Sequence, residues 1–177
     1  MNRYILYVIA GYLSGSVLYA RVMCHLFGGE AALPDCKDSN PGASNAFACG
    51  GFACGALTLT GDLLKGIVPV WLFVRSGEPI TPTALALVLA APVAGHAFPC
   101  FYGFHGGKGI AVSFGCLLGL VPLWEPVLLF AGCFIFFSVV VKITPHFQRT
   151  AVTYLVTLLL MALTHQLRGV TGGYMLI

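Results

Sequence analysis

A glycine-rich segment with a single lysine, residues 95–109, has the composition of an anion-binding loop. It reads Gly-His-Ala-Phe-Pro-Cys-Phe-Tyr-Gly-Phe-His-Gly-Gly-Lys-Gly. Glycines let a backbone curl with its amides pointing inward, and such a concavity beside a lysine favours phosphate. An apolar segment begins at residue 110, so the amides of a helix N-terminus would add to this preference. The alternative is a flexible turn with a solvated lysine. Gly109 follows Lys108 where a Walker A loop has serine or threonine, so no nucleotide is expected as a ligand.

A second polar cluster occupies residues 38–45, between the first two apolar segments. It reads Asp-Ser-Asn-Pro-Gly-Ala-Ser-Asn and is dense in short side chains that donate or accept hydrogen bonds. This density favours contact with a substrate. The alternative is a turn at Pro41-Gly42 followed by a helix that Ser44 or Asn45 caps.

Three ionisable residues lie inside apolar stretches, where they are costly and by default functional. Asp62 and Lys65 are three residues apart, so on a helix they share a face and can pair. The alternative is a purely structural ion pair between helices. His96 is either a general base or a hydrogen-bond donor that satisfies a kinked helix. His96 and His105 lack a third ligand at usable spacing, so the sequence predicts no metal and no cofactor.

The composition identifies an integral membrane protein whose environment is the lipid bilayer. Of 177 residues, 58% are hydrophobic and only 8% are charged, and the mean hydropathy is +0.91. Soluble domains carry roughly 25% charged residues. The formal charge of +3 is small and scattered, which argues against nucleic acid as a partner.

The apolar segments predict an all-α, polytopic transmembrane bundle of five to six helices, or seven with some short, in a single domain over residues 1–177. A helix needs about 20 apolar residues to cross a bilayer. The candidate spans are 4–27, 46–74, 81–104 and 151–167, with 110–141 as a helical hairpin broken at 122–126. Small residues at 11 and 14–16 predict a close helix contact. An external N-terminus would place both polar clusters on the cytoplasmic side.

These motifs resemble those of the membrane-integral acyl-phosphate:glycerol-3-phosphate acyltransferases of bacterial phospholipid synthesis, the PlsY family. The family pattern Gly-His-x-Phe-Pro-x-Phe-x-x-Phe-x-Gly-Gly-Lys-Gly matches residues 95–109. The Asn-x-Gly-Ala-Thr-Asn core matches residues 40–45, with Ser44 in place of threonine. An Asp-x-x-Lys-Gly element matches residues 62–66. The three matches follow in order within residues 8–115.

The resemblance implies an enzyme that transfers an acyl group from acyl phosphate to glycerol-3-phosphate, giving 1-acyl-glycerol-3-phosphate for phospholipid synthesis in the inner membrane. It implies catalytic roles for Asp38, Ser39, His96 and Lys108, with His96 or Asp38 taking the proton. The substrate-binding residues that it implies are Asn40, Gly42, Ser44, Asn45, Asp62, Lys65, His105, Gly106, Gly107, Lys108 and Gly109.

The sequence departs from the family at four places. Asp38 stands where serine is usual, Ala48 where arginine is usual and His105 where lysine is common, and the C-terminal third motif has no convincing counterpart. Two alternatives therefore remain. One is a catalytically impaired relative that binds a phosphorylated ligand. The other is a small transporter with Asp62, Lys65 and Lys108 along its pathway, although a transporter predicts an inverted repeat that the sequence does not show.

Overall fold

The protein is all-α over the residues that the computed structural model describes, 3–27 and 40–170, and these contain no strand. The predicted fold class is therefore confirmed. The chain forms two compact units, Met1–Pro122 and Leu123–Ile177. A single domain over residues 1–177 stays a prediction.

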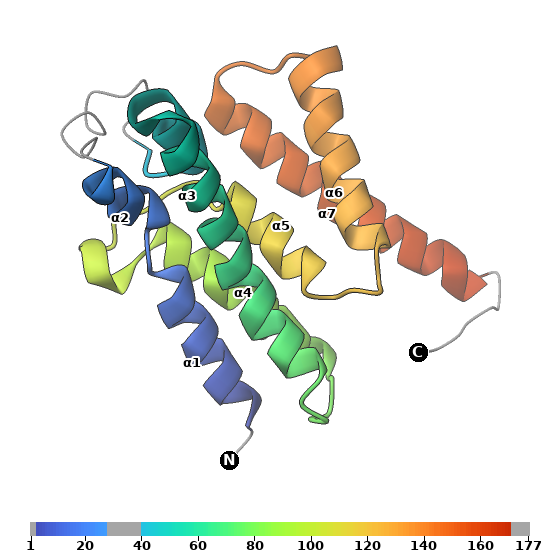
Figure 1. The fold of residues 1–177 in the computed structure, drawn as a ribbon. Helices are drawn as coiled ribbons and strands as arrows, with labels where there is room; N and C mark the ends of the chain where they lie inside the picture. The colour runs from blue at the N-terminus through green and yellow to red at the C-terminus, as the bar shows by residue number, and fades with distance from the viewer. Residues whose placement is uncertain (1–2, 28–39, 171–177) are drawn as a thin grey trace. The chain divides into compact units, whose positions relative to one another are not determined.

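The first unit contains five α-helices and a short 3-10 turn among its described residues (Figure 1). They are α1 (Tyr4–Gly15), α2 (Tyr19–Leu26), α3 (Ala43–Val74), α4 (Pro82–Ala97), η2 (Cys100–Tyr102) and α5 (Ile110–Leu118). α1 packs against α4 and α3, and α3 also packs against α2 and α5. The two polar clusters of the sequence flank α3 and α4, so these packed helices bring them together.

The second unit pairs two helices. α6 (Glu125–Ile135) continues into a π-helical turn, η3 (Phe136–Val140), and packs against α7 (His146–Val170). An aromatic contact joins the helices, with the Phe130 and Tyr154 ring centroids 5.1 Å apart in an edge arrangement. Such aromatic pairs add to the stability that burial of apolar area provides.

Four helical segments are long and apolar enough to cross a membrane: Tyr4–Leu26, Ala43–Val74, Pro82–Tyr102 and Phe147–Thr164. They correspond to four of the predicted spans, although the first is interrupted between α1 and α2. The predicted hairpin at 110–141 does divide into two helices at the proline-containing segment. However, α5 has only nine residues and is about 14 Å long, too short for a crossing.

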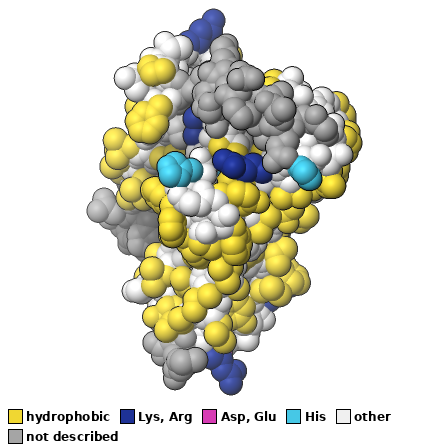
Figure 2. All heavy atoms as spheres, turned by 90° about the vertical axis from the view of Figure 1, so that its left-hand side faces the viewer, with side chains coloured by type: hydrophobic (Ala, Val, Ile, Leu, Met, Phe, Trp, Pro, Cys, Tyr) yellow, Lys and Arg dark blue, Asp and Glu magenta, His cyan; other side chains and the backbone are white. Residues whose placement is uncertain are grey.

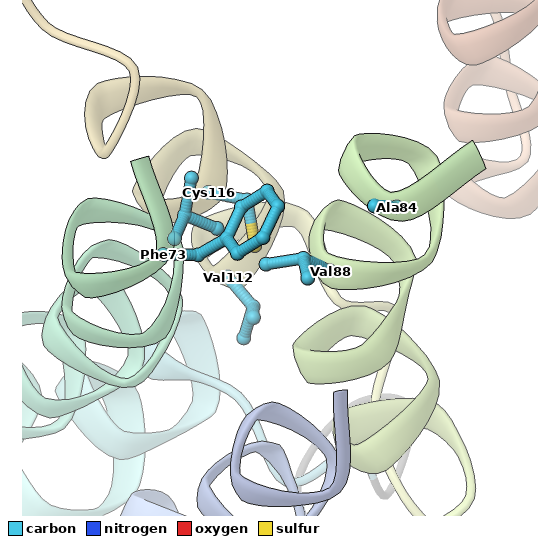
Figure 3. Packing of buried hydrophobic residues seen from close by; sticks show 6 residues of the cluster. Phe73, Ala84, Val88, Val112 and Cys116 are labelled. Atoms are coloured by element: carbon cyan, nitrogen blue, oxygen red, sulfur yellow. The ribbon is translucent and has the colours of Figure 1, made fainter. Parts of the chain in front are cut away.

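Apolar side chains fill the centre of the first unit and also cover much of its surface. Figure 3 shows Phe73 of α3 packed towards Val88 of α4, with Val112 and Cys116 of α5 beside them. On the outside, Phe52 is 81% exposed, and many other large apolar side chains of α1, α3 and α4 are exposed as well. Figure 2 shows hydrophobic side chains over most of one face. A water-soluble monomer rarely exposes such area, so this surface suits contact with lipid.

Glycines allow the helices of the first unit to approach closely. A Cβ atom at Gly15 of α1 would collide with the Pro92 carbonyl oxygen of α4, and one at Gly95 would collide with the Tyr12 carbonyl oxygen. Gly66 of α3 and Gly115 of α5 have the same relation to the facing backbones. The close contact predicted from the small residues near position 15 is thus confirmed.

Candidate functional site

The sequence-predicted pair of Asp62 and Lys65 forms a deeply buried ion pair on α3. The Lys65 Nζ lies 2.8 Å from Asp62 Oδ1, and the side chains are 1% and 2% exposed, respectively. Burial of two charges is costly and is repaid only by good geometry and further hydrogen bonds. The remaining contacts of Lys65 are therefore central to the site.

Lys65 also reaches two other segments of the first unit. Its Nζ donates to the carbonyl oxygen of Val17 at 2.7 Å and lies 2.8 Å from the Nδ1 of His96. The ammonium nitrogen thus has three partners within 2.8 Å: the Val17 carbonyl oxygen, the His96 Nδ1 and, as an ion pair, the Asp62 carboxylate. Sequence reasoning missed Val17, because a carbonyl becomes available only where a helix is interrupted.

Ser16 accounts for part of that interruption between α1 and α2. Its hydroxyl donates to the Tyr12 carbonyl oxygen at 2.9 Å, a side-chain contact that bends helices. The same Ser16 oxygen accepts a hydrogen bond from the Cys100 amide at 3.3 Å, and the Tyr12 hydroxyl donates to the Phe98 carbonyl oxygen at 2.7 Å. Hydrogen bonds therefore join the end of α1 to the start of the loop at residues 98–109, which is called the glycine–lysine loop.

That loop folds back onto the end of α4. The Gly107 amide donates to the His96 carbonyl oxygen at 3.0 Å, and the Phe104 amide donates to the Pro99 carbonyl oxygen, also at 3.0 Å. Gly103 and Gly109 adopt positive φ values of 59° and 72°, which glycine tolerates best. Gly109 is the N-cap residue of α5, so the loop leads directly into that helix N-terminus.

The glycines of the loop also make room for His96 and Asn40. A Cβ atom at Gly106 would collide with the His96 carbonyl oxygen. At Gly107 it would overlap with the His96 Nε2 and lie 3.2 Å from the Asn40 Oδ1. The two polar clusters, residues 38–45 and 95–109, therefore meet at Gly107.

Asn40 is held in place by Asn45, whose Nδ2 donates to the Asn40 carbonyl oxygen at 3.0 Å. Asn45 is 7% exposed and lies in the first turn of α3. The N-cap residue of this helix is Gly42, without a side-chain cap, so capping by Ser44 or Asn45 is wrong. Ser44 and Asn45 lie two and three positions beyond the N-cap, inside the first turn of the helix. Asp38 and Ser39 lie outside the described residues.

The other predicted site residues have different surroundings. His105 is exposed, and its Nδ1 lies 2.6 Å from the Gly103 carbonyl oxygen within its own loop. Lys108 is half-buried and directly precedes the α5 N-cap. A lysine directly before the helix N-cap adds a positive charge to a segment that leads into the partial positive charge of the α5 N-terminus, a combination that favours a bound anion. Within the described part of the chain, no group of three His, Cys, Asp or Glu residues could hold a metal ion.

A buried lysine–aspartate–histidine cluster beside a glycine–lysine loop, carried on apolar helices of membrane-crossing length, defines an integral membrane protein with a candidate anion site. The chain belongs to the glycerol-3-phosphate acyltransferase family, whose model matches residues 5–177.

Curated relatives with this description come from several bacteria. The chain is 43% identical over 124 residues to the glycerol-3-phosphate acyltransferase of Cupriavidus taiwanensis, a match that covers 67% of this chain and 59% of the relative. It is 41% identical over 116 residues to that of Shewanella halifaxensis, covering 64% and 55%. The chain thus spans between half and two thirds of the length of these relatives.

Solved structures agree with the fold. A crystal structure of PlsY (YgiH), described as an integral membrane glycerol 3-phosphate acyltransferase in its glycerol 3-phosphate form, superimposes with a TM-score of 0.74 at 25% identity. The match covers 91% of this chain and 77% of that one. The lysophosphatidic acid form of PlsY gives a TM-score of 0.73 over 91% and 76% of the two chains.

Proposed function

We propose that this chain transfers an acyl group from acyl phosphate to glycerol-3-phosphate, giving 1-acyl-glycerol-3-phosphate. The observation that carries the proposal is the meeting of the two polar clusters, where the Gly107 backbone lies against both His96 and Asn40. The family match over residues 5–177 and the descriptions of the two PlsY structures support the same reaction.

The reaction suits a site with few functional groups. Acyl phosphate is a mixed anhydride, so its carbonyl carbon is already activated and phosphate is a good leaving group. A hydroxyl of glycerol-3-phosphate attacks this carbon, a new ester C–O bond forms, the C–O bond to phosphate breaks, and the hydroxyl gives up its proton. The protein must mainly hold two phosphorylated molecules in line, which is catalysis by positioning and electrostatics.

Each cluster has a role in this scheme. The loop of Gly106, Gly107, Lys108 and Gly109 binds the phosphate of glycerol-3-phosphate, aided by the N-terminus of α5. Asn40, Ser44 and Asn45 contact the acyl phosphate or order the loop before α3. The acyl chain enters between apolar helices from the bilayer, and both clusters lie at the cytoplasmic side of the inner membrane.

The test is an assay of the full chain purified in detergent, with acyl phosphate and labelled glycerol-3-phosphate as substrates. We expect labelled 1-acyl-glycerol-3-phosphate, and we expect Lys108→Ala to lower its rate at least tenfold because a charge-assisted contact is lost. Arg75→Ala is the matched control. It also removes one positive charge, but at the C-terminal end of α3, whereas Asn45 of the candidate site lies at the N-terminal end.

The residue at position 48 favours one alternative, a catalytically impaired relative that binds a phosphorylated ligand. The family position that usually carries arginine is Ala48, an exposed residue of α3 without charge. If the protein binds glycerol-3-phosphate in a Lys108-dependent way but forms no product, it is a catalytically impaired relative and the acyl-transfer proposal is wrong. Uptake of glycerol-3-phosphate into vesicles without acylation would instead identify a transporter.

A further inference from the structure

His96 has a hydrogen-bonding pattern that limits what it can do. Its Nδ1 lies 2.8 Å from the Lys65 ammonium nitrogen. A lysine ammonium donates hydrogen bonds and has no acceptor, so Nδ1 must be the acceptor in this contact. A neutral imidazole carries one N–H, and with Nδ1 accepting, that proton resides on Nε2.

The opposite tautomer has no suitable partner among the neighbours of Nδ1 that the structure describes. An N–H at Nδ1 would point at the ammonium, which cannot accept it. The Asp62 Oδ1 is 3.8 Å from Nδ1, beyond hydrogen-bond distance. The ammonium is itself held by Asp62 at 2.8 Å and by the Val17 carbonyl oxygen at 2.7 Å. These contacts keep Lys65 in place against His96.

The Nε2 nitrogen of His96 faces the glycine-rich loop at Gly107. A Cβ atom added to Gly107 would overlap with Nε2, and the same position is 3.2 Å from the Asn40 Oδ1. The main chain of His96 is fixed as well, because its carbonyl oxygen accepts a hydrogen bond from the Gly107 amide. His96 is only 3% exposed, so its ring has little freedom to turn over.

We propose that Asp62 and Lys65 are positioning residues that fix His96 as the Nε2–H tautomer, which makes this histidine a hydrogen-bond donor to a phosphate oxygen bound at the Gly106–Gly109 loop. This assignment rests on the proposed function for the identity of the phosphate, and it differs from the general base that was one of the two roles the sequence left open for His96. A base needs an unprotonated nitrogen facing the substrate hydroxyl. The nitrogen that faces the loop carries the proton, whereas the unprotonated one faces Lys65.

The tautomer can be measured directly on the full chain. Nitrogen NMR of the protein labelled with ¹⁵N in its five histidines, in detergent micelles, distinguishes protonated from unprotonated ring nitrogens. The His96 signals are assigned by their loss in His96→Gln. We expect an unprotonated Nδ1 and a protonated Nε2 without any ligand. A proton on Nδ1, or on both nitrogens, would overturn the proposal.

Removal of the Lys65 donors tests the positioning role. Lys65→Met keeps a long unbranched side chain but has no N–H, so the fixed preference for Nε2–H should give way to a mixture of tautomers. Because Lys65→Met leaves the Asp62 carboxylate buried without its cation, the double variant with Asp62→Asn removes both charges and serves if the single variant does not fold. An unchanged tautomer in either variant would contradict the positioning role.

Two substitutions distinguish a role of His96 as a hydrogen-bond donor from a role as a general base. The amide nitrogen of glutamine reaches about as far as Nε2, whereas that of asparagine reaches only about as far as Nδ1. We expect His96→Asn to bind glycerol-3-phosphate about ten- to a hundredfold more weakly than His96→Gln, since a hydrogen bond to a charged group is lost. Neither amide accepts a proton at neutral pH, so a general base predicts equal affinity and equal loss of turnover in both variants.

The two proposals fail in different ways. If the wild-type protein neither binds nor acylates glycerol-3-phosphate, the proposed function is wrong. The role of His96 as a hydrogen-bond donor to the bound phosphate is then wrong too, whatever tautomer is found. If it does bind and acylate, but Nδ1 is protonated or the two His96 variants behave alike, only the inference about His96 is wrong.

Discussion

The Gly107 amide donates a hydrogen bond to the His96 carbonyl oxygen at 3.0 Å, and a Cβ atom added to Gly107 would overlap with the Nε2 of the same histidine. The backbone of the loop thus contacts both the main chain and the side chain of His96. The contact connects the last turn of α4 with the loop that precedes α5, and it leaves no room for a side chain at position 107.

Gly107→Ala should therefore lower acyltransferase activity at least tenfold without unfolding the protein. The added methyl group must push aside the His96 ring or the Asn40 side chain, and misplacement of catalytic groups by about 1 Å can cost 100-fold in rate. Rates with glycerol-3-phosphate and acyl phosphate are the measurement. Gly132→Ala on α6, where a Cβ meets no atom within 4 Å, is the control and should retain wild-type activity.

Asn45→Asp should weaken the site through Asn40. The change keeps the size of the side chain but replaces the Nδ2 donor with an oxygen, so the 3.0 Å bond to the Asn40 carbonyl oxygen becomes a repulsive contact. We expect the KM for at least one substrate to rise about threefold or more. Ala43→Ser, at the first residue of α3, changes the same helical turn but spares this bond, so it serves as the control. Equal KM values for Asn45→Asp and the wild type would argue against the role of Asn45.

Asp62→Ala should destabilise the protein by about 3–5 kcal/mol, because it leaves the Lys65 ammonium buried without its anion. The double variant Asp62→Ala/Lys65→Met removes both charges and should recover part of that loss. The measurement is the free energy of unfolding in mixed detergent micelles for both single variants and the double variant. Additive effects would mean that the two side chains do not interact.

Gly15→Ala should destabilise the first unit more than Gly11→Ala, although both replace a glycine of α1. A Cβ at Gly15 collides with the Pro92 backbone, which yields little, and overpacking typically costs about 1–3 kcal/mol. At Gly11 the nearest atom is the Pro92 Cγ at 3.2 Å, and alanine gains up to about 1 kcal/mol in helix propensity. Thermal unfolding of the two variants compares them, and an equal Tm would contradict this account of the α1–α4 contact.

Much of the fold could be predicted from the sequence because lipid-facing helices need long apolar segments. Four candidate spans, the break in the 110–141 segment and the close contact of α1 follow from composition and small residues alone. The interruption at Val17 could not, since no proline marks residues 16–18. The bend depends on the Ser16 hydroxyl and on the Cys100 amide, which is 84 positions away.

The sequence by itself determined that this chain is a membrane-embedded helical protein with two polar clusters and an Asp62–Lys65 pair on one helical face. Periodicity and hydropathy are local properties, so they can be read from neighbouring residues. Only the tertiary structure decided that Lys65 contacts His96 Nδ1, and that Nε2 faces Gly107 beside Asn40. These contacts join α3, α4 and two loops, and the direction of each ring nitrogen depends on helix packing that no local pattern encodes.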